Sequence, residues 1–185
     1  MFIGNGWDLH KHSASKPMYL AGIEFDEEGF EGYSDGDIIL HALCDALLGS
    51  VGKKDLGHYF PSKQPTEKGI RSTVMLEKVL EIIDYDKLKV RNVDITVISQ
   101  RIFISEKREN LEKSISKLLN IEESKVNIKG KSADFLGLIG DKKASASLVI
   151  ADVGPLQVKR KSDGDSSLLQ LEFIDVKLKP GMAVA

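Results

Sequence analysis

Hydrophobic and polar residues alternate in several short stretches of the chain, and between these stretches the apolar positions recur at helical spacing. Alternation or short apolar runs predict strands over residues 2–10, 18–25, 90–99, 125–131 and 145–153. Helical spacing predicts helices over residues 34–48, 67–83 and 106–119. Polar and glycine-containing segments predict loops over residues 12–16, 26–33 and 55–61.

The first predicted helix carries a clear start signal. Ser34 is the expected N-cap, and Asp35 and Asp37 are expected in the first turn, where the helix dipole favours anions. Strands and helices alternate along the chain, which favours an α+β fold with a mixed β-sheet packed against α-helices. We expect one domain over residues 1–153. Residues 154–185 are expected to form a C-terminal extension of unknown role, with a linker at 159–167 and a further strand over 168–178.

The amino-acid composition limits the kinds of binding partner and the cellular compartment that we expect for this protein. The formal net charge of -2 gives no electrostatic case for binding nucleic acid. No apolar stretch approaches the ~20 residues of a membrane span, so no membrane partner is expected. Cys44 is the only cysteine, which rules out an internal disulfide, and the N-terminus enters a strand-like run without a signal peptide. A cytoplasmic protein is therefore expected.

Two histidines and an aspartate form the main candidate site. Asp8 and His10 are two residues apart, so on a strand both side chains point to one face. His41 would approach them from the first helix. One carboxylate and two imidazoles form the ligand set of a catalytic zinc with an open position. Asp37 and Asp45 each lie four residues from His41, and one of them could orient its ring; the alternative is a helix-start partner and a surface charge.

Four sequence blocks, in order, resemble one enzyme family. They are Ile3-Gly-Asn-Gly-Trp-Asp-Leu-His10, Ser34-Asp-Gly-Asp-Ile-Ile-Leu-His-Ala-Leu-Cys-Asp-Ala-Leu-Leu-Gly49, Asp55-Leu-Gly-His-Tyr-Phe-Pro61 and Asn92-Val-Asp-Ile-Thr-Val-Ile98. Their order and spacing, over roughly residues 2–153, are similar to those of the 2-C-methyl-D-erythritol 2,4-cyclodiphosphate synthases.

The resemblance implies a homotrimer with active sites between neighbouring subunits. It implies cyclisation of 4-diphosphocytidyl-2-C-methyl-D-erythritol 2-phosphate, a cytidine diphosphate compound, with release of CMP in non-mevalonate isoprenoid biosynthesis. One zinc ion per subunit would be bound by Asp8, His10 and His41. A magnesium or manganese ion would bridge the substrate diphosphate, with help from Asp134. The substrate-binding residues implied are Asp8, His10, Tyr33, Ser34, Asp55, Leu56, Gly57, Phe60, Lys131, Ser132 and Asp134.

The chain departs from the family pattern at several of these positions. Tyr33 stands where the family has a histidine, and Ser132 matches a threonine; both positions are credited with catalysis by stabilising the transition state. Asp134 replaces a glutamate and is one methylene shorter. The lysine-methionine-leucine loop of the cytidine pocket appears here as residues 103–105, while Lys131 brings a cation nearby. Two rival functions follow: a non-catalytic zinc-binding trimer of the same fold, or a metal-dependent phosphoesterase acting on another substrate.

Overall fold

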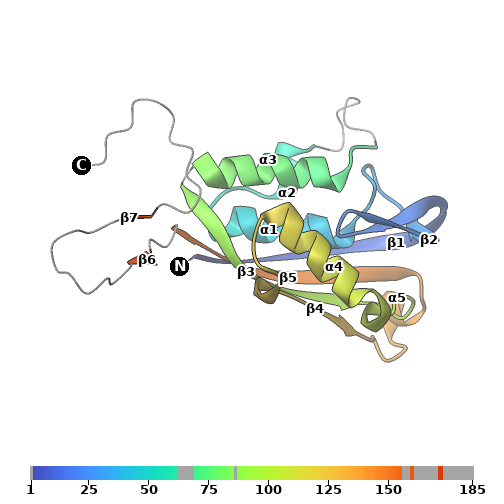
Figure 1. Cartoon of the computed structure of the whole chain (residues 1–185). Helices are drawn as coiled ribbons and strands as arrows, with labels where there is room; N and C mark the ends of the chain where they lie inside the picture. The colour runs from blue at the N-terminus through green and yellow to red at the C-terminus, as the bar shows by residue number, and fades with distance from the viewer. Residues whose placement is uncertain (1, 62–68, 86, 156–158, 161–170, 173–185) are drawn as a thin grey trace. The chain divides into compact units, whose positions relative to one another are not determined.

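The computed structural model describes residues 2–61, 69–85, 87–155, 159–160 and 171–172, and the chain falls into two units, Met1–Pro155 and Leu156–Ala185 (Figure 1). The first unit contains a five-stranded sheet with the order β2-β1-β5-β3-β4. Its strands are β1 (Phe2–Leu20), β2 (Ile23–Phe30), β3 (Leu88–Ile98), β4 (Val126–Lys131) and β5 (Ala144–Pro155). Its helices are α1 (Ile38–Ser50), α2 (Leu56–Tyr59), α3 (Ser72–Tyr85), α4 (Ile104–Leu119), the 3₁₀ helix η2 (Glu123–Lys125) and α5 (Gly137–Gly140).

The sheet is mixed, as predicted. Strand β1 pairs antiparallel with β2 and β5, and β5 pairs antiparallel with β3, whereas β3 and β4 are parallel. A parallel pair needs a crossover connection, and α4 supplies it between β3 and β4. The predicted α+β class is therefore confirmed.

The helices α1, α3 and α4 lie on one side of the sheet (Figure 1). Helix α1 packs on β1 and β5 and is buried around almost its whole circumference, which explains why its sequence is apolar on all sides. On the other side of the sheet, Ile3, Trp7, Leu148 and Ile150 are each more than a third exposed. One apolar face of the sheet is therefore uncovered in the single chain.

Two glycines allow α1 to lie directly on β1. A Cβ atom at Gly4 would lie 2.0 Å from the carbonyl oxygen of Ala46, and one at Gly6 would lie 1.9 Å from that of Ala42. Because no side chain can fit into this gap, glycine is required at both positions for the two backbones to approach so closely. This approach brings His41 of α1 over Asp8 and His10 of β1.

Several predicted boundaries were wrong. Residues 12–16 are not a loop, because β1 continues to Leu20 with an irregularity between Ser13 and Pro17. Most of the loop predicted at 26–33 belongs to β2, which runs to Phe30. Two residues, Ala21 and Gly22, both with positive φ, connect the strands as a tight hairpin.

The remaining differences concern helices and the C-terminal unit. Helix α3 begins at Ser72 rather than at residue 67; residues 67 and 68 lie outside the described residues. The segment 55–61 contains the short helix α2. In the second unit, β6 (Lys159–Arg160) pairs antiparallel with β7 (Leu171–Glu172). The predicted linker at 159–167 therefore begins with a strand, and most of the predicted strand at 168–178 lies outside the described residues.

The first helix begins at Ile38 with Asp37, not Ser34, as its N-cap. Asp37 Oδ1 accepts hydrogen bonds from the backbone amides of Ile39 and Leu40, and Oδ2 accepts one from Gly22 at 2.7 Å. Asp37 is fully buried, and burial raises the pKa of its carboxyl group, although the donors of Gly22 and Leu40 act in the opposite direction. This carboxylate therefore ties the β1–β2 hairpin to the start of α1.

Asp37→Ala should lower the free energy of unfolding by about 2–4 kcal/mol, because it removes the N-cap and leaves the Gly22 amide without its acceptor. Asp37→Asn should cost about 1–2 kcal/mol, since one amide oxygen can still cap the helix. Denaturant unfolding measures both. Asp26→Ala, at an exposed position of β2, is the control and should change stability by less than about 0.5 kcal/mol. An Asp37→Ala variant as stable as this control would contradict the assignment.

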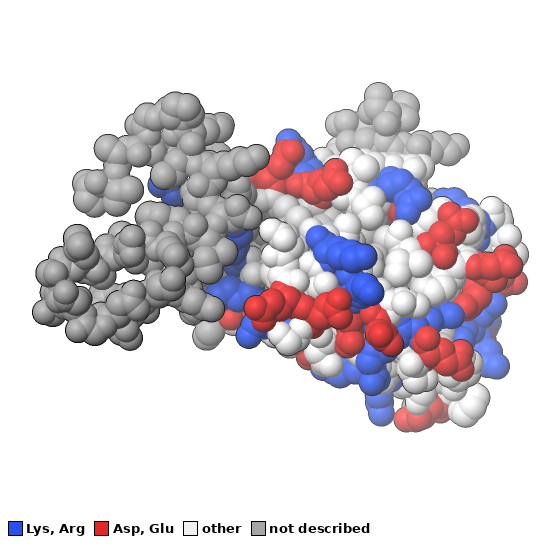
Figure 2. Space-filling view, viewed as in Figure 1, with Lys and Arg blue, Asp and Glu red and all other residues white. Residues whose placement is uncertain are grey.

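Charged side chains of both signs are interspersed over the described part of the face seen in Figure 2. Within the described part of the chain, Lys107 forms an ion pair with Glu27, and Arg101 forms one with Glu28. Among the described residues, no helix is both long and apolar enough to cross a membrane.

Candidate metal centre and its pocket

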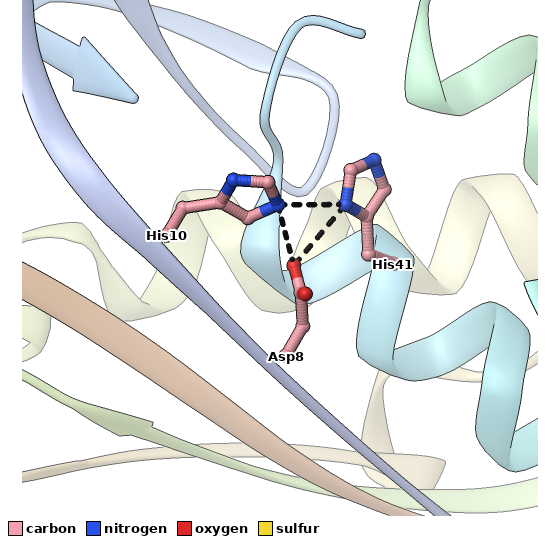
Figure 3. Close-up of side chains that lie close together, drawn as sticks. All are labelled: Asp8, His10 and His41. Carbon is pink, nitrogen blue, oxygen red and sulfur yellow. Dashed lines mark hydrogen bonds and ion pairs between the residues drawn. The ribbon is translucent and has the colours of Figure 1, made fainter. Parts of the chain in front are cut away.

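Asp8, His10 and His41 converge on one point (Figure 3). Asp8 and His10 project from the same face of β1, and His41 comes from the first turn of α1. Asp8 Oδ2 lies 3.1 Å from His10 Nε2 and 3.1 Å from His41 Nδ1, and the two nitrogens are 3.3 Å apart. The side chains are between 11% and 23% exposed, so the cluster is open on one side.

These distances fit a metal ion. A tetrahedral zinc with ligand bonds of about 2.0–2.1 Å holds its ligand atoms about 3.3–3.4 Å apart, close to the spacings here. A carboxylate oxygen and two imidazole nitrogens are also the donor types of catalytic zinc sites. The three residues can therefore hold a divalent cation while leaving one coordination position open.

A backbone carbonyl fixes the orientation of His10. Its Nδ1 lies 2.6 Å from the carbonyl oxygen of Glu31, which can only accept, so Nδ1 carries the proton. In the neutral ring, Nε2 then presents its lone pair toward Asp8 and His41. Sequence reasoning missed this contact, since nothing in the sequence indicates that the end of β2 reaches β1 at this point.

The three groups also shift one another's pKa. Burial raises the pKa of Asp8, but hydrogen bonds and charges from His10 and His41 outweigh it and hold this pKa far below its usual range. Burial lowers the pKa of His10, whereas the Asp8 carboxylate raises it, and the net direction is upward. Protons and a metal ion therefore compete for the same lone pairs.

A hydroxyl group, rather than an aspartate, supports His41. Ser34 Oγ lies 3.0 Å from His41 Nε2 and accepts a further hydrogen bond from the Gly36 amide. Asp37 caps α1, and Asp45 Oδ1 accepts from the amide of Leu56, so the carboxylates of both are engaged elsewhere. The prediction that Asp37 or Asp45 orients the His41 ring is therefore not supported. Asp37 is instead the partner of the helix start.

The cluster opens into a pocket of about 240 Å³. The pocket is lined by His10, Tyr33, Ser34, His41, Leu56, Gly57, Phe60, Ile70 and Met75. All but Ile70 and Met75 were singled out from the sequence; these two belong to the segment before α3 and to α3 itself. Most of the lining is apolar, so a polar ligand here would be oriented by few polar groups.

The wall formed by Leu56, Gly57 and Phe60 is fixed from two sides. The carboxylate of Asp55 caps α2 by accepting from the amide of His58, and Asp45 of α1 holds the amide of Leu56 at 2.7 Å. Asp55 thus lies beside the pocket and shapes its wall. Tyr33 stands at the pocket with 46% of its surface exposed.

Lys131, Ser132 and Asp134 form a separate group at the end of β4. Ser132 Oγ donates to Asp134 Oδ1 at 2.7 Å, and all three residues are exposed. Beside them lies the start of α4, because Gly130 packs against Ile104. None of the three lines the metal pocket of the same chain. Within one chain, the predicted site residues are therefore split into two groups.

Comparisons with known proteins show which family the chain belongs to and which solved structures its fold resembles. The model of the YgbB family matches residues 1–153. The 2-C-methyl-D-erythritol 2,4-cyclodiphosphate synthase of Caldicellulosiruptor bescii is 39% identical over 139 residues, covering 75% of this chain and 88% of that protein. The bifunctional enzyme IspD/IspF of Aliarcobacter butzleri is 40% identical over 140 residues, but this chain spans only 37% of its length. The CDP complex of Plasmodium falciparum IspF has a TM-score of 0.75 and 36% identity, over 84% of this chain and 97% of that one.

Proposed function

The chain belongs to the YgbB family, and on this premise we propose that it is a 2-C-methyl-D-erythritol 2,4-cyclodiphosphate synthase, a phosphorus-oxygen lyase of non-mevalonate isoprenoid biosynthesis. The substrate is 4-diphosphocytidyl-2-C-methyl-D-erythritol 2-phosphate. An oxygen of its 2-phosphate bonds to the β-phosphorus, and the bond from that phosphorus to the bridging oxygen breaks. The bridging oxygen leaves with CMP. The observation that carries this proposal is the convergence of Asp8, His10 and His41. The two histidines of this cluster line one pocket together with Tyr33 and Ser34.

The chain's own residues mainly position the substrate. Attacking and leaving groups belong to one molecule, so the site has to fold that molecule into an in-line pose. Asp8, His10 and His41 would hold the zinc ion, which when bound polarises a phosphoryl oxygen as a Lewis acid. Tyr33 and Ser34 lie in the same pocket and offer hydroxyl donors to developing negative charge. Leu56 and Phe60 form an apolar part of the wall of this pocket.

A trimer would complete the site. Lys131, Ser132 and Asp134 lie apart from the metal pocket in one chain, so a neighbouring subunit has to present them if they contact the same substrate. The uncovered apolar face of the sheet, with Trp7, Ile150 and their neighbours, is a surface that subunit contact would bury. The P. falciparum structure in complex with CDP supports a cytidine nucleotide as the ligand of such a site. We therefore propose a homotrimer with active sites between subunits.

A second cation is proposed next to Asp134. Two phosphate groups of the substrate repel each other, and a bound magnesium or manganese ion would reduce this repulsion by supplying positive charge. Asp134 is exposed at the end of β4 and is held by the Ser132 hydroxyl, so its carboxylate is available on one side. Lys131 adds a positive charge in the same group.

We also propose a cytoplasmic setting, in line with the single buried thiol of Cys44.

Tyr33→His should raise kcat by roughly tenfold. An imidazolium at this position would stabilise the transition state with a full charge, and a single donor of this kind contributes about 10²–10³ in rate, of which the tyrosine hydroxyl already supplies part. Steady-state kinetics with the proposed substrate measures the change. Tyr33→Phe, which loses the hydroxyl alone, should lower kcat. A fall in kcat for Tyr33→His would mean that the tyrosine is an integral part of a reorganised site.

Product analysis distinguishes the proposed function from its rivals. The synthase forms CMP and the cyclic diphosphate in equal amounts from the proposed substrate. A phosphoesterase would release inorganic phosphate from this or another substrate. A protein that binds zinc as a trimer and forms neither product would be the non-catalytic relative.

A further inference from the structure

The segment 31–34, which carries Tyr33 and Ser34 into the pocket, is fastened by its backbone carbonyls. Glu31 O accepts from His10 Nδ1, and Tyr33 O accepts from the Gly69 amide at 2.7 Å. Gly32 O and Ser34 O both accept from a single group, the ammonium of Lys16, at 2.7 and 3.0 Å. Four successive carbonyls are thus held in place, two of them by one side chain.

The fold delivers Lys16 to this place through an irregularity in β1. The register with β2 passes from Ser13 directly to Pro17, so Lys16 lies in the stretch that has no regular partner across the strand pair. Such bulges commonly re-aim a side chain. The side chain of Lys16 is redirected from the β1–β2 ladder onto the segment that follows β2.

The ammonium group of Lys16 has a fixed position relative to the pocket. Its two carbonyl partners, Gly32 O and Ser34 O, flank Tyr33, and both Tyr33 and Ser34 line that pocket.

We propose that Lys16 is a positioning residue of the metal site, which holds segment 31–34 against β1 and thereby places the Ser34 hydroxyl on His41 and Tyr33 at the pocket. The effect on metal binding follows from the chain of contacts. Lys16 holds the Ser34 carbonyl, and the Ser34 hydroxyl lies 3.0 Å from His41 Nε2, while His41 Nδ1 faces the metal position. The effect on turnover rests on the proposed function.

The primary test uses zinc alone as the probe. Lys16→Met keeps the length of the side chain but removes its charge and donors, and Lys16→Arg keeps both. Competition with a chromophoric chelator should show zinc binding to Lys16→Met weakened about 10-fold, in the range typical for groups that orient metal ligands. Lys16→Arg should stay within about threefold of the wild-type affinity. Lys11→Met is the matched control. Lys11 lies on the same strand, and among the described residues its ammonium pairs with the exposed carboxylate of Glu31 rather than with a backbone carbonyl of segment 31–34.

A double-mutant cycle tests whether Lys16 affects zinc binding through Ser34. If Lys16 acts through Ser34, then Lys16→Met should weaken zinc binding by less than about threefold in a Ser34→Ala background, instead of about 10-fold. Amide hydrogen exchange should become faster over residues 32–36 in Lys16→Met and not in Lys11→Met. With zinc saturating, kcat for the proposed substrate should fall about 10-fold with little change in KM, and Lys16→Arg should restore it.

Zinc affinity and hydrogen exchange of Lys16→Met equal to those of Lys11→Met would overturn the proposal. Fully additive effects of Lys16→Met and Ser34→Ala would also overturn it, because Lys16 would then not act through Ser34. Should Lys16→Met fail to fold, Lys16→Gln at the same position allows the same comparison against Lys11→Gln. The zinc and exchange measurements do not depend on turnover, so a wild-type protein without synthase activity would refute the proposed function and leave this inference to its own test.

Discussion

His41→Ala should lose zinc and synthase activity together. His41 is one of the three candidate ligands found in the described part of the chain, and its Nδ1 lies 3.1 Å from Asp8 Oδ2 and 3.3 Å from His10 Nε2. Lewis-acid stabilisation by a bound metal contributes several kcal/mol at the transition state, and about 4 kcal/mol corresponds to about 10³ in rate. Metal analysis after gel filtration and a CMP assay of the same sample measure the two losses.

His58→Ala is the control for this substitution. His58 is exposed on α2, and its ring contacts Tyr59 edge-on, outside the cluster of candidate ligands. This variant should keep one zinc per chain. If His41→Ala retained its zinc at wild-type stoichiometry, the assignment of His41 as a ligand would be wrong.

Gly6→Ala should destabilise the protein by about 3 kcal/mol or more and weaken zinc binding at the same time. The added Cβ would lie 1.9 Å from the carbonyl oxygen of Ala42 and 2.7 Å from the amide nitrogen of Ala46. Overpacking usually costs about 1–3 kcal/mol, and here the neighbour is helix backbone that cannot rotate away. Helix α1 would have to move from β1 and carry His41 away from Asp8. Denaturant unfolding and zinc titration measure the two effects.

Gly49→Ala separates this clash from any general effect of adding a methyl group. Gly49 lies in the last turn of α1, where a Cβ would approach Asn5 O no closer than 3.9 Å. Since alanine is favoured over glycine in helices by up to about 1 kcal/mol, Gly49→Ala should be neutral or stabilising. If Gly6→Ala matched Gly49→Ala in both stability and zinc affinity, the close approach of α1 to β1 would not be needed for either property.

Strands and helices with a clear apolar pattern were predicted well from the sequence. The residues at which helices begin were predicted poorly, because they depend on the backbone conformation of particular glycines. Ser34 and Asp37 are both good N-cap residues by type. Gly36, between them, has a φ of +76°, which no α-helix can include, so α1 starts after it and Asp37 caps the helix. Gly69, with a φ of +82°, likewise lies before α3 and precedes its start at Ser72. Because tertiary surroundings determine whether a glycine adopts a positive φ, these two helix starts could not be predicted from the sequence.

The predicted loop at 12–16 shows how pairing overrides local composition. Its serines and lysine have no strand preference, but His12 and Ser13 pair with Phe30 and Gly29 of β2, which keeps the backbone extended. Sequence periodicity also placed Asp8 and His10 on one face, as observed. The groups that support the ligands, Glu31 O for His10 and Ser34 Oγ for His41, were not predictable, because they depend on the register in which β2 pairs with β1.

The most direct test of the proposed function is product formation from 4-diphosphocytidyl-2-C-methyl-D-erythritol 2-phosphate by zinc-loaded protein, with and without magnesium. Chromatography for CMP and phosphorus NMR for the cyclic diphosphate should find the two products in a one-to-one ratio, with much faster formation when magnesium is present. A folded protein that keeps its zinc but forms neither product would contradict the account. It would mean that the protein kept its metal but lost or changed its substrate, in line with its departures from the family pattern at Tyr33 and at residues 103–105.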